Sequence, residues 1–115
     1  MLERIADAAN HFCLNGLLNR SIFELSGGEK QRIACASVYA VHPDIFVLDE
    51  PSSNLDPASI QQLKDVLLKL KAEGKTLVIS EHRLYYLLDI ADRFIWLDQG
   101  AVSYTHLTLP TILLV

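Results

Sequence analysis

Residues 45–51 read Ile45-Phe46-Val47-Leu48-Asp49-Glu50-Pro51, and the architecture of this chain is predicted outward from them. Four consecutive apolar residues bounded by turn formers are typical of a strand covered on both faces, as in a parallel sheet. The strand delivers two carboxylates to its carboxyl end, the edge at which open α/β sheets bind ligands. Because successive strand residues diverge, Asp49 and Glu50 can have different roles.

On either side of this strand the pattern alternates between helices and strands. His42-Pro43 ends one helix, because the residue before a proline is pushed out of the helical region. Asp56 as N-cap and Pro57 in the first position begin the next, and Gly74 closes it. The predicted elements are helices over residues 2–12, 25–41, 57–73 and 84–91, strands over residues 45–48, 76–80 and 94–97, and a turn over residues 98–100. This alternation predicts an α/β fold with a mostly parallel sheet and flanking helices.

Composition narrows the class of protein. The chain has 115 residues, half of them apolar, and a net charge of −4. That is room for one domain at most, and the acidic balance argues against nucleic acid or an anionic membrane as a direct partner. Cys13 and Cys35 stand far apart, which fits a reducing compartment. No apolar run approaches the roughly 20 residues that span a bilayer, and residues 1–7 lack a signal peptide's apolar centre. We expect a soluble, cytoplasmic chain.

A candidate anion site lies in residues 25–32, which read Leu25-Ser26-Gly27-Gly28-Glu29-Lys30-Gln31-Arg32. Ser26 can cap the helix, and Glu29 can complete a capping box. Taken alone, that pattern predicts only an ordinary capped helix. Two glycines in the first turn weaken a helix by up to about 1 kcal/mol each relative to alanine. A purely structural cap would not need them, so they favour an anion site built from the first amides and the helix dipole.

Three side chains at predicted strand ends are candidates for catalysis. Of Asp49 and Glu50, one can hold a hydrated Mg²⁺ and the other can orient an attacking water. Alone, an apolar run that ends in Asp-Glu also fits a solvated strand end. His82 follows the strand predicted over residues 76–80 and emerges at the same sheet edge if the two strands are parallel. Its imidazole could then donate to a phosphate oxygen, although a single histidine after a strand is more often structural.

Taken together and in this order, the segments resemble the ATPase domain of the ABC superfamily. Residues 25–32 resemble its signature motif, and residues 45–51 resemble its Walker B strand. Residues 52–57, Ser-Ser-Asn-Leu-Asp-Pro, resemble its D-loop, and His82 stands at the position of its H-loop. The resemblance covers residues 2 to about 102 and implies a P-loop NTPase-type fold.

The resemblance also implies ATP and Mg²⁺ as ligands and a role for each candidate residue. Asp49 would help to hold Mg²⁺, Glu50 would be the base for the water that attacks the γ-phosphate, and His82 would contact that phosphate. The nucleotide would be sandwiched between two such domains, with Asp56 at their interface. The residues implied to bind the partner domain's nucleotide are Ser26, Gly27, Gly28, Glu29 and Gln31.

Two details favour one branch of the family. Gln-Arg after the signature and Ser-x-Leu-Asp-Pro in the D-loop resemble importers. Ser-Glu-His-Arg around His82, followed by Leu-Tyr-Tyr-Leu, resembles the energy-coupling-factor transporters, which take up vitamins and metal ions. This implies integral membrane transporter subunits as partners, a place on the inner face of the cell membrane, and no nucleic acid. A non-transport ABC protein acting on ribosomes or DNA and an inert truncated product remain as alternatives.

Both ends of the sequence depart from the family's pattern. The P-loop, Gly-x₄-Gly-Lys-Ser/Thr, does not occur in it. We therefore expect residues 1–101 to be the C-terminal half of the domain, with the N-terminal half missing, apolar sheet edges left open and no activity in isolation. Residues 102–115 resemble a translated transposon-end adaptor, so we expect a non-native tail and give Tyr104 and His106 no role. The alternative is a natural β-rich C-terminus that packs on the sheet.

Overall fold

The computed structural model describes the backbone of residues 1–107 and 112–114 and the side chains of residues 1–102. The remaining positions of the predicted tail, 108–111 and 115, lie outside the described residues. In chain order the elements are α1 (Leu2–His11), the 3₁₀ turn η1 (Ile22–Glu24), α2 (Gly27–Tyr39), β1 (Ile45–Asp49), α3 (Pro57–Ala72), β2 (Thr76–Ser80), the 3₁₀ turn η2 (Leu84–Tyr86), β3 (Arg93–Asp98), β4 (Ala101–Leu107) and β5 (Ile112–Leu114).

The strands form one sheet in the order β1-β2-β5-β3-β4. All neighbours run parallel except β3 and β4, which form an antiparallel hairpin. Gln99 and Gly100 turn that hairpin with φ values of +48° and +79°, the left-handed pair that two-residue hairpin turns need. The predicted α/β class, the mostly parallel sheet and the turn are confirmed.

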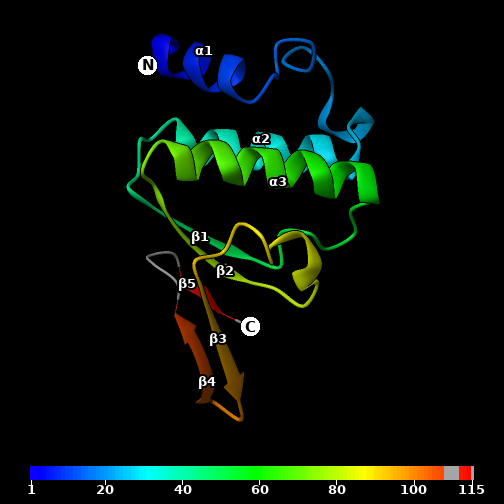
Figure 1. The fold of residues 1–115 in the computed structure, drawn as a ribbon. Coiled ribbons are helices and arrows are strands. Elements are labelled where there is room, and N and C mark those ends of the chain that lie inside the picture. Colours follow the sequence, from blue (N-terminus) through cyan, green and yellow to red (C-terminus); the bar gives the residue numbers. More distant parts are fainter. Residues whose placement is uncertain (108–111, 115) are drawn as a thin grey trace.

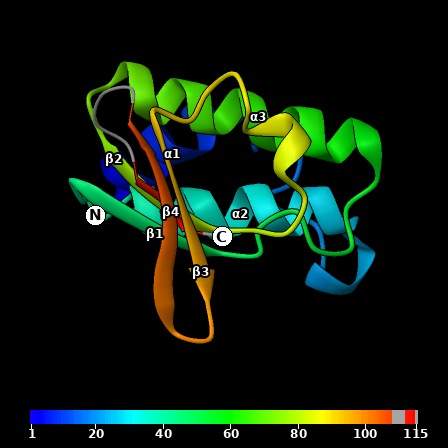
Figure 2. The same cartoon turned by 60° about the horizontal axis from the view of Figure 1, so that its bottom comes forward.

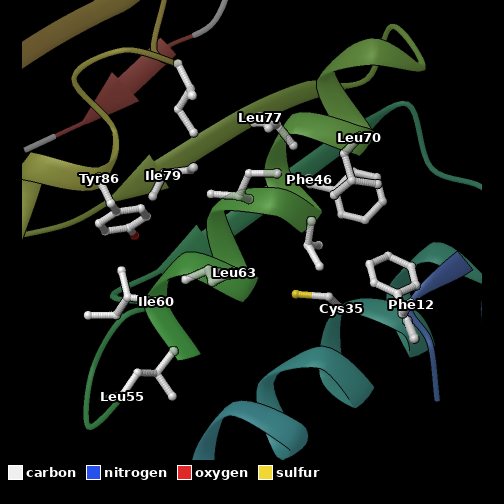
Figure 3. Close-up of a cluster of buried hydrophobic side chains, with 14 of the residues drawn as sticks. Phe12, Cys35, Phe46, Leu55, Ile60, Leu63, Leu70, Leu77, Ile79 and Tyr86 are labelled. Carbon is white, nitrogen blue, oxygen red and sulfur yellow. The ribbon is translucent and has the colours of Figure 1, made fainter. Parts of the chain in front are cut away.

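The core lies between the sheet and the helices. Figure 1 shows α2 and α3 side by side over the sheet, with α1 above them as a further layer. In Figure 3, Phe46, Leu77 and Ile79 of the sheet lie in one cluster with Leu63 and Leu70 of α3. Phe46 is 1% exposed and Leu70 is fully buried. Burial of such side chains, each worth about 1.5–3 kcal/mol, holds the strand ends in place.

One face of β1 is open, so the prediction of a strand covered on both faces is wrong for this chain. Ile45 is 61% exposed and Val47 is 75% exposed, whereas Phe46 between them is buried. The reason is that α1, α2 and α3 all lie on the same side of the sheet (Figures 1 and 2). In the described sheet β1 is also an edge strand.

The helix predicted over residues 84–91 is also wrong. Only the short turn η2 forms there. After it, the Leu87 and Ile90 amides donate to carbonyls three residues back, and a single bond of α-helical spacing joins the Ala91 amide to the Leu87 carbonyl. Leu87 and Ile90 are buried while Leu88 is 63% exposed. The apolar residues therefore follow the three-residue period of a 3₁₀ turn, and the spacing was mistaken for that of an α-helix. Lys71 reaches over from α3 and donates to the Ile90 carbonyl at 2.6 Å.

Candidate functional site

The carboxyl ends of β1 and β2 bring two of the predicted residues together. The strands are parallel, with Asp49 opposite Ser80, and the Glu50 amide donates to the Ser80 carbonyl at 2.8 Å. Two residues after Ser80, His82 Nε2 lies 3.0 Å from Glu50 Oε1, and both side chains are well exposed, at 82% and 49%. Asp49 is exposed at the last position of β1. The expected parallel arrangement thus forms an accessible acid–imidazole pair.

Glu50 adopts an unusual backbone conformation. Its φ is +44°, in the left-handed region that non-glycine residues seldom occupy. Such a residue costs about 1–3 kcal/mol and persists where the surrounding structure over-determines it, which happens often at functional sites. Here the turn directs the chain away from the sheet immediately after the second carboxylate.

Glu81 is a site residue that the sequence did not single out. Its carboxylate is buried and accepts hydrogen bonds from the amides of Ser52, His82 and Arg83 and from the Tyr86 hydroxyl. Burial raises the pKa of Glu81, but the hydrogen bonds, from Ser52 and Tyr86 above all, outweigh it and lower the pKa below its ordinary value of 4.5. The carboxylate is therefore charged at neutral pH. An acid placed directly after an apolar strand, with a tyrosine five residues on, was the available signal.

The amino end of α2 forms the predicted capping box. Ser26 Oγ accepts from the Glu29 amide at 3.2 Å, and Glu29 Oε2 accepts from the Ser26 amide at 2.8 Å. The bond from the Ser26 amide is the main reason why the pKa of Glu29 is lowered. The Ser26 amide and the Ser26 hydroxyl are thus both bonded to Glu29, and in the described residues no hydrogen bond joins Ser26 to Glu50. The carboxylate of Glu29 is thus engaged in the cap.

Gly28 has a packing role that corrects the argument made from its sequence. A Cβ at this position would lie 2.7 Å from Ser59 Cβ on α3, closer than real side chains approach, and would also clash with Ser59 Oγ. A glycine is therefore required where α2 crosses α3, whatever ligand the helix end binds. At Gly27 a Cβ would meet only ordinary contacts, including the Asn54 carbonyl at 3.5 Å. Gln31 is half-buried on the same helix.

Asp56 serves as the N-cap of α3, with Oδ1 accepting from the Ser59 amide at 3.2 Å. Hydrogen bonding from the Ser59 side chain, more than that from the Ser59 amide, lowers the pKa of the Asp56 carboxyl against a smaller opposing effect of burial. The structural reading of this residue is therefore correct as far as it goes. Asp56 begins α3 directly after the loop that follows β1, and Gly27 at the start of α2 lies beside Asn54 of the same loop. The amino ends of α2 and α3 are therefore both close to this loop.

The carboxylates of the described residues fit a metal ion held jointly with substrate phosphates and water better than one held by protein side chains alone. No group of three or more histidine, cysteine, aspartate or glutamate side chains among these residues could hold an ion. Mg²⁺ commonly takes one or two carboxylates and completes its shell with water and substrate phosphates. Asp49 at its exposed strand end fits that pattern.

None of the helices described is both long and apolar enough to span a bilayer.

Comparison with known proteins gives consistent matches. The profile of the family described as "ABC transporter" matches residues 1–53. A putative ABC transporter ATP-binding protein of Treponema denticola is 54% identical over 90% of this chain, and the energy-coupling factor transporter ATP-binding protein EcfA2 of Methanospirillum hungatei is 39% identical over 87%. The chain spans only 21% and 25% of the lengths of these two proteins.

A solved structure adds the three-dimensional match. It is the dimeric post-hydrolysis state of the ATP-binding cassette MJ0796 bound to ADP and Pi, and it superposes with a TM-score of 0.76 at 27% identity. The alignment covers 94% of this chain and 47% of the MJ0796 chain. The fold described above is thus shared with somewhat less than half of the MJ0796 chain.

Proposed function

Since this chain belongs to the ABC transporter ATP-binding family, we propose that it is the C-terminal half of a cassette that hydrolyses ATP to drive an uptake transporter of the energy-coupling-factor type. The observation that carries the proposal is the Glu50–His82 contact of 3.0 Å, exposed at the carboxyl ends of two parallel strands. The similarity to EcfA2 supports the transporter type. The 47% coverage of the MJ0796 cassette supports a partial domain.

At the strand ends, we assign Glu50 as the base that orients the attacking water and takes up its proton. His82 stands beside that carboxylate and would donate a hydrogen bond to a γ-phosphate oxygen, where negative charge needs a donor. Asp49 would help to hold Mg²⁺, which when bound neutralises phosphate charge. Since both side chains of the pair are exposed, a nucleotide can reach them without any rearrangement of the core.

At the amino end of α2, we assign Ser26, Gly27 and Gly28 to the nucleotide held by a second cassette. The first amides of a helix have no acceptor within it, and the helix dipole favours an anion there. Glu29 contributes by holding the cap rather than by touching phosphate, because a carboxylate next to phosphate would repel it. Gln31 supports the helix from its half-buried position, and Asp56 lies toward the partner domain.

The partners that follow are a second ABC ATPase domain and integral membrane transporter subunits, with no nucleic acid. The assembly would place this chain on the cytoplasmic face of the cell membrane. Residues 1–101 would be the native half-domain, and residues 102–115 would be an appended tail. The support for the tail is its resemblance to a translated transposon-end adaptor. Reading the genomic DNA on both sides of this reading frame tests that assignment directly.

The decisive variant is Glu50→Gln in the full-length cassette that contains this chain. Glutamine keeps the size and a hydrogen-bonding group but is not basic, so ATP-dependent dimerisation should persist while phosphate release falls by about 10²-fold or more, roughly 2.7 kcal/mol of transition-state stabilisation. Glu73→Gln, at the far end of α3, is the matched control and should retain turnover. Normal turnover in Glu50→Gln would refute the base assignment. The chain by itself should show no turnover, because the P-loop contacts are absent from its sequence.

A further inference from the structure

Glu81 is a buried carboxylate whose hydrogen-bond donors come from both loops that follow β1 and β2. Only 3% of Glu81 is exposed. Its Oε2 accepts from the Ser52 amide at 3.1 Å and from the Tyr86 hydroxyl at 2.8 Å. Its Oε1 accepts from the amides of His82 at 2.9 Å and Arg83 at 3.3 Å. Each oxygen thus has two donors, and one carboxylate joins the two loops.

This charge is buried without a cation. Within the described part of the chain, no ion pair joins Glu81 to a lysine, arginine or histidine side chain. Burial of an ionised carboxylate is unfavourable unless well-oriented donors replace the lost water. A side chain that only filled space here would need no charge. The four donors must therefore be held in a fixed geometry, and the charge in turn fixes the backbone that carries them.

We propose that Glu81 is a positioning residue that sets the separation of Glu50 and His82. Ser52 lies two residues after Glu50, and His82 directly follows Glu81, so the bonds to the Ser52 and His82 amides hold the backbone on both sides of the exposed pair. The inference rests on the proposed function, because Glu81 acts only through that pair. Because it is buried, Glu81 would touch neither the nucleotide nor the reacting water.

A second, weaker link runs beside the first. The Arg83 guanidinium donates from Nη1 to the Leu55 carbonyl at 3.3 Å. Arg83 is exposed, so water competes for this bond and the buried carboxylate remains the main connection between the loops.

The test is Glu81→Gln in the full-length cassette, alone and combined with His82→Ala. In glutamine an NH₂ group, which is a donor, replaces one of the two accepting oxygens. It therefore meets either the Ser52 amide and the Tyr86 hydroxyl or the amides of His82 and Arg83, all of which are donors themselves. We expect kcat to fall by about 10-fold or more, since a misplacement of about 1 Å can cost 10²-fold, with KM for ATP unchanged within about twofold. In the His82→Ala background the same substitution should have less than about a twofold further effect, because the contact that it positions is already gone.

The outcomes separate this inference from the proposed function. An unchanged kcat in Glu81→Gln, or a full multiplicative loss in the His82→Ala background, would overturn the positioning role. Turnover in Glu50→Gln, measured in parallel, decides the proposed function independently. Glu73→Gln is the control, since this carboxylate also accepts from a tyrosine hydroxyl, that of Tyr39 at 3.3 Å, and it should keep wild-type kcat.

If Glu81→Gln does not fold, Tyr86→Phe carries the test. It removes one of the four bonds and leaves the charge in place, so we expect kcat to fall a few-fold, about in line with one lost bond to a charged group. That loss should also vanish in the His82→Ala background. An equal loss in both backgrounds would show that Tyr86 and Glu81 support the fold and do not position the pair.

Discussion

The amino end of α2 and the carboxyl ends of β1 and β2 carry the two parts of the proposed chemistry, and they are assembled in different ways. At α2 the decisive hydrogen bonds join Ser26 and Glu29, which are three residues apart. At the sheet edge they join residues 29 apart, from Ser52 to Glu81, and 28 apart, from Arg83 to Leu55. The first site can form as soon as its helix does, whereas the second exists only when the sheet is complete.

The difference implies different weaknesses. A capping box is worth about 0.5–2 kcal/mol and is exposed to solvent, so its loss disturbs one helix end. A buried carboxylate with four donors belongs to one cooperative network, and removal of one partner leaves the others unsatisfied. We therefore expect substitutions at α2 to change binding across a dimer, and substitutions at the sheet edge to change hydrolysis.

The largest expected effect comes from Ser26→Arg in the full-length cassette. The arginine would fill the anion site at the start of α2 and block closure of two cassettes around ATP, so light scattering should show no ATP-dependent dimer. Turnover should fall by at least the roughly 10²-fold expected for loss of the base. Ser37→Arg, an exposed position on the same helix, is the control and should dimerise normally. Normal dimerisation of Ser26→Arg would remove the distinction between the two regions.

His82→Ala should separate hydrolysis from binding. It removes one donor to the γ-phosphate while the P-loop contacts of the full-length protein remain, so phosphate release should slow by about 10²-fold. ATP affinity, measured by equilibrium binding, should change by less than about threefold. A parallel loss of ATP affinity would mean that the sheet edge contributes to nucleotide binding as well as to hydrolysis, and would contradict the separation of roles between the two regions.

Gly28→Ala tests whether the α2 end is as local as its capping box suggests. Its new Cβ would overlap Ser59 on α3, and such overpacking typically destabilises by about 1–3 kcal/mol. Thermal unfolding should show a lowered Tm, and Ser59→Gly in the same protein should restore it. Gly27→Ala is the matched control, because its Cβ would meet only ordinary contacts at 3.5 Å. Equal Tm values for the two alanine variants would show that α2 and α3 can separate without loss.

The smallest effect concerns acid stability. The pKa values of Glu29 and Glu81 are both lowered in the folded chain, by hydrogen bonds, against an ordinary value of 4.5. A lowered pKa contributes stability above the unfolded value that is lost as the pH falls through the folded value. Tm should therefore fall below about pH 4.5. Glu81→Gln should flatten that decline more than Glu29→Gln does, since the Glu29 bond is at the surface and screened by solvent. If Glu29→Gln flattened the fall of Tm at low pH more than Glu81→Gln does, the expected ranking of the two carboxylates would be wrong.

Much of the fold could be predicted because its signals are local. The capping residues Ser26 and Asp56 and the terminator Gly74 place helix ends to within a residue or two. The apolar runs of β1 and β2 place the strands. The prediction failed over residues 84–91, where tertiary burial of Leu87 and Ile90, in the turns that follow η2, imitates a helical pattern.

The sequence by itself predicted the helices α1, α2 and α3, the strands β1, β2 and β3, the capping box of α2 and the candidates Asp49, Glu50 and His82, because each depends on residues within one helix, turn or strand. Only the tertiary structure decided three other features: that Gly28 must be a glycine against Ser59, that one face of β1 stays open, and that Glu81 joins the two loops. The physical reason is common to all three. Steric overlap, burial and long-range hydrogen bonds depend on the distance between residues in space, which no local pattern of side chains records.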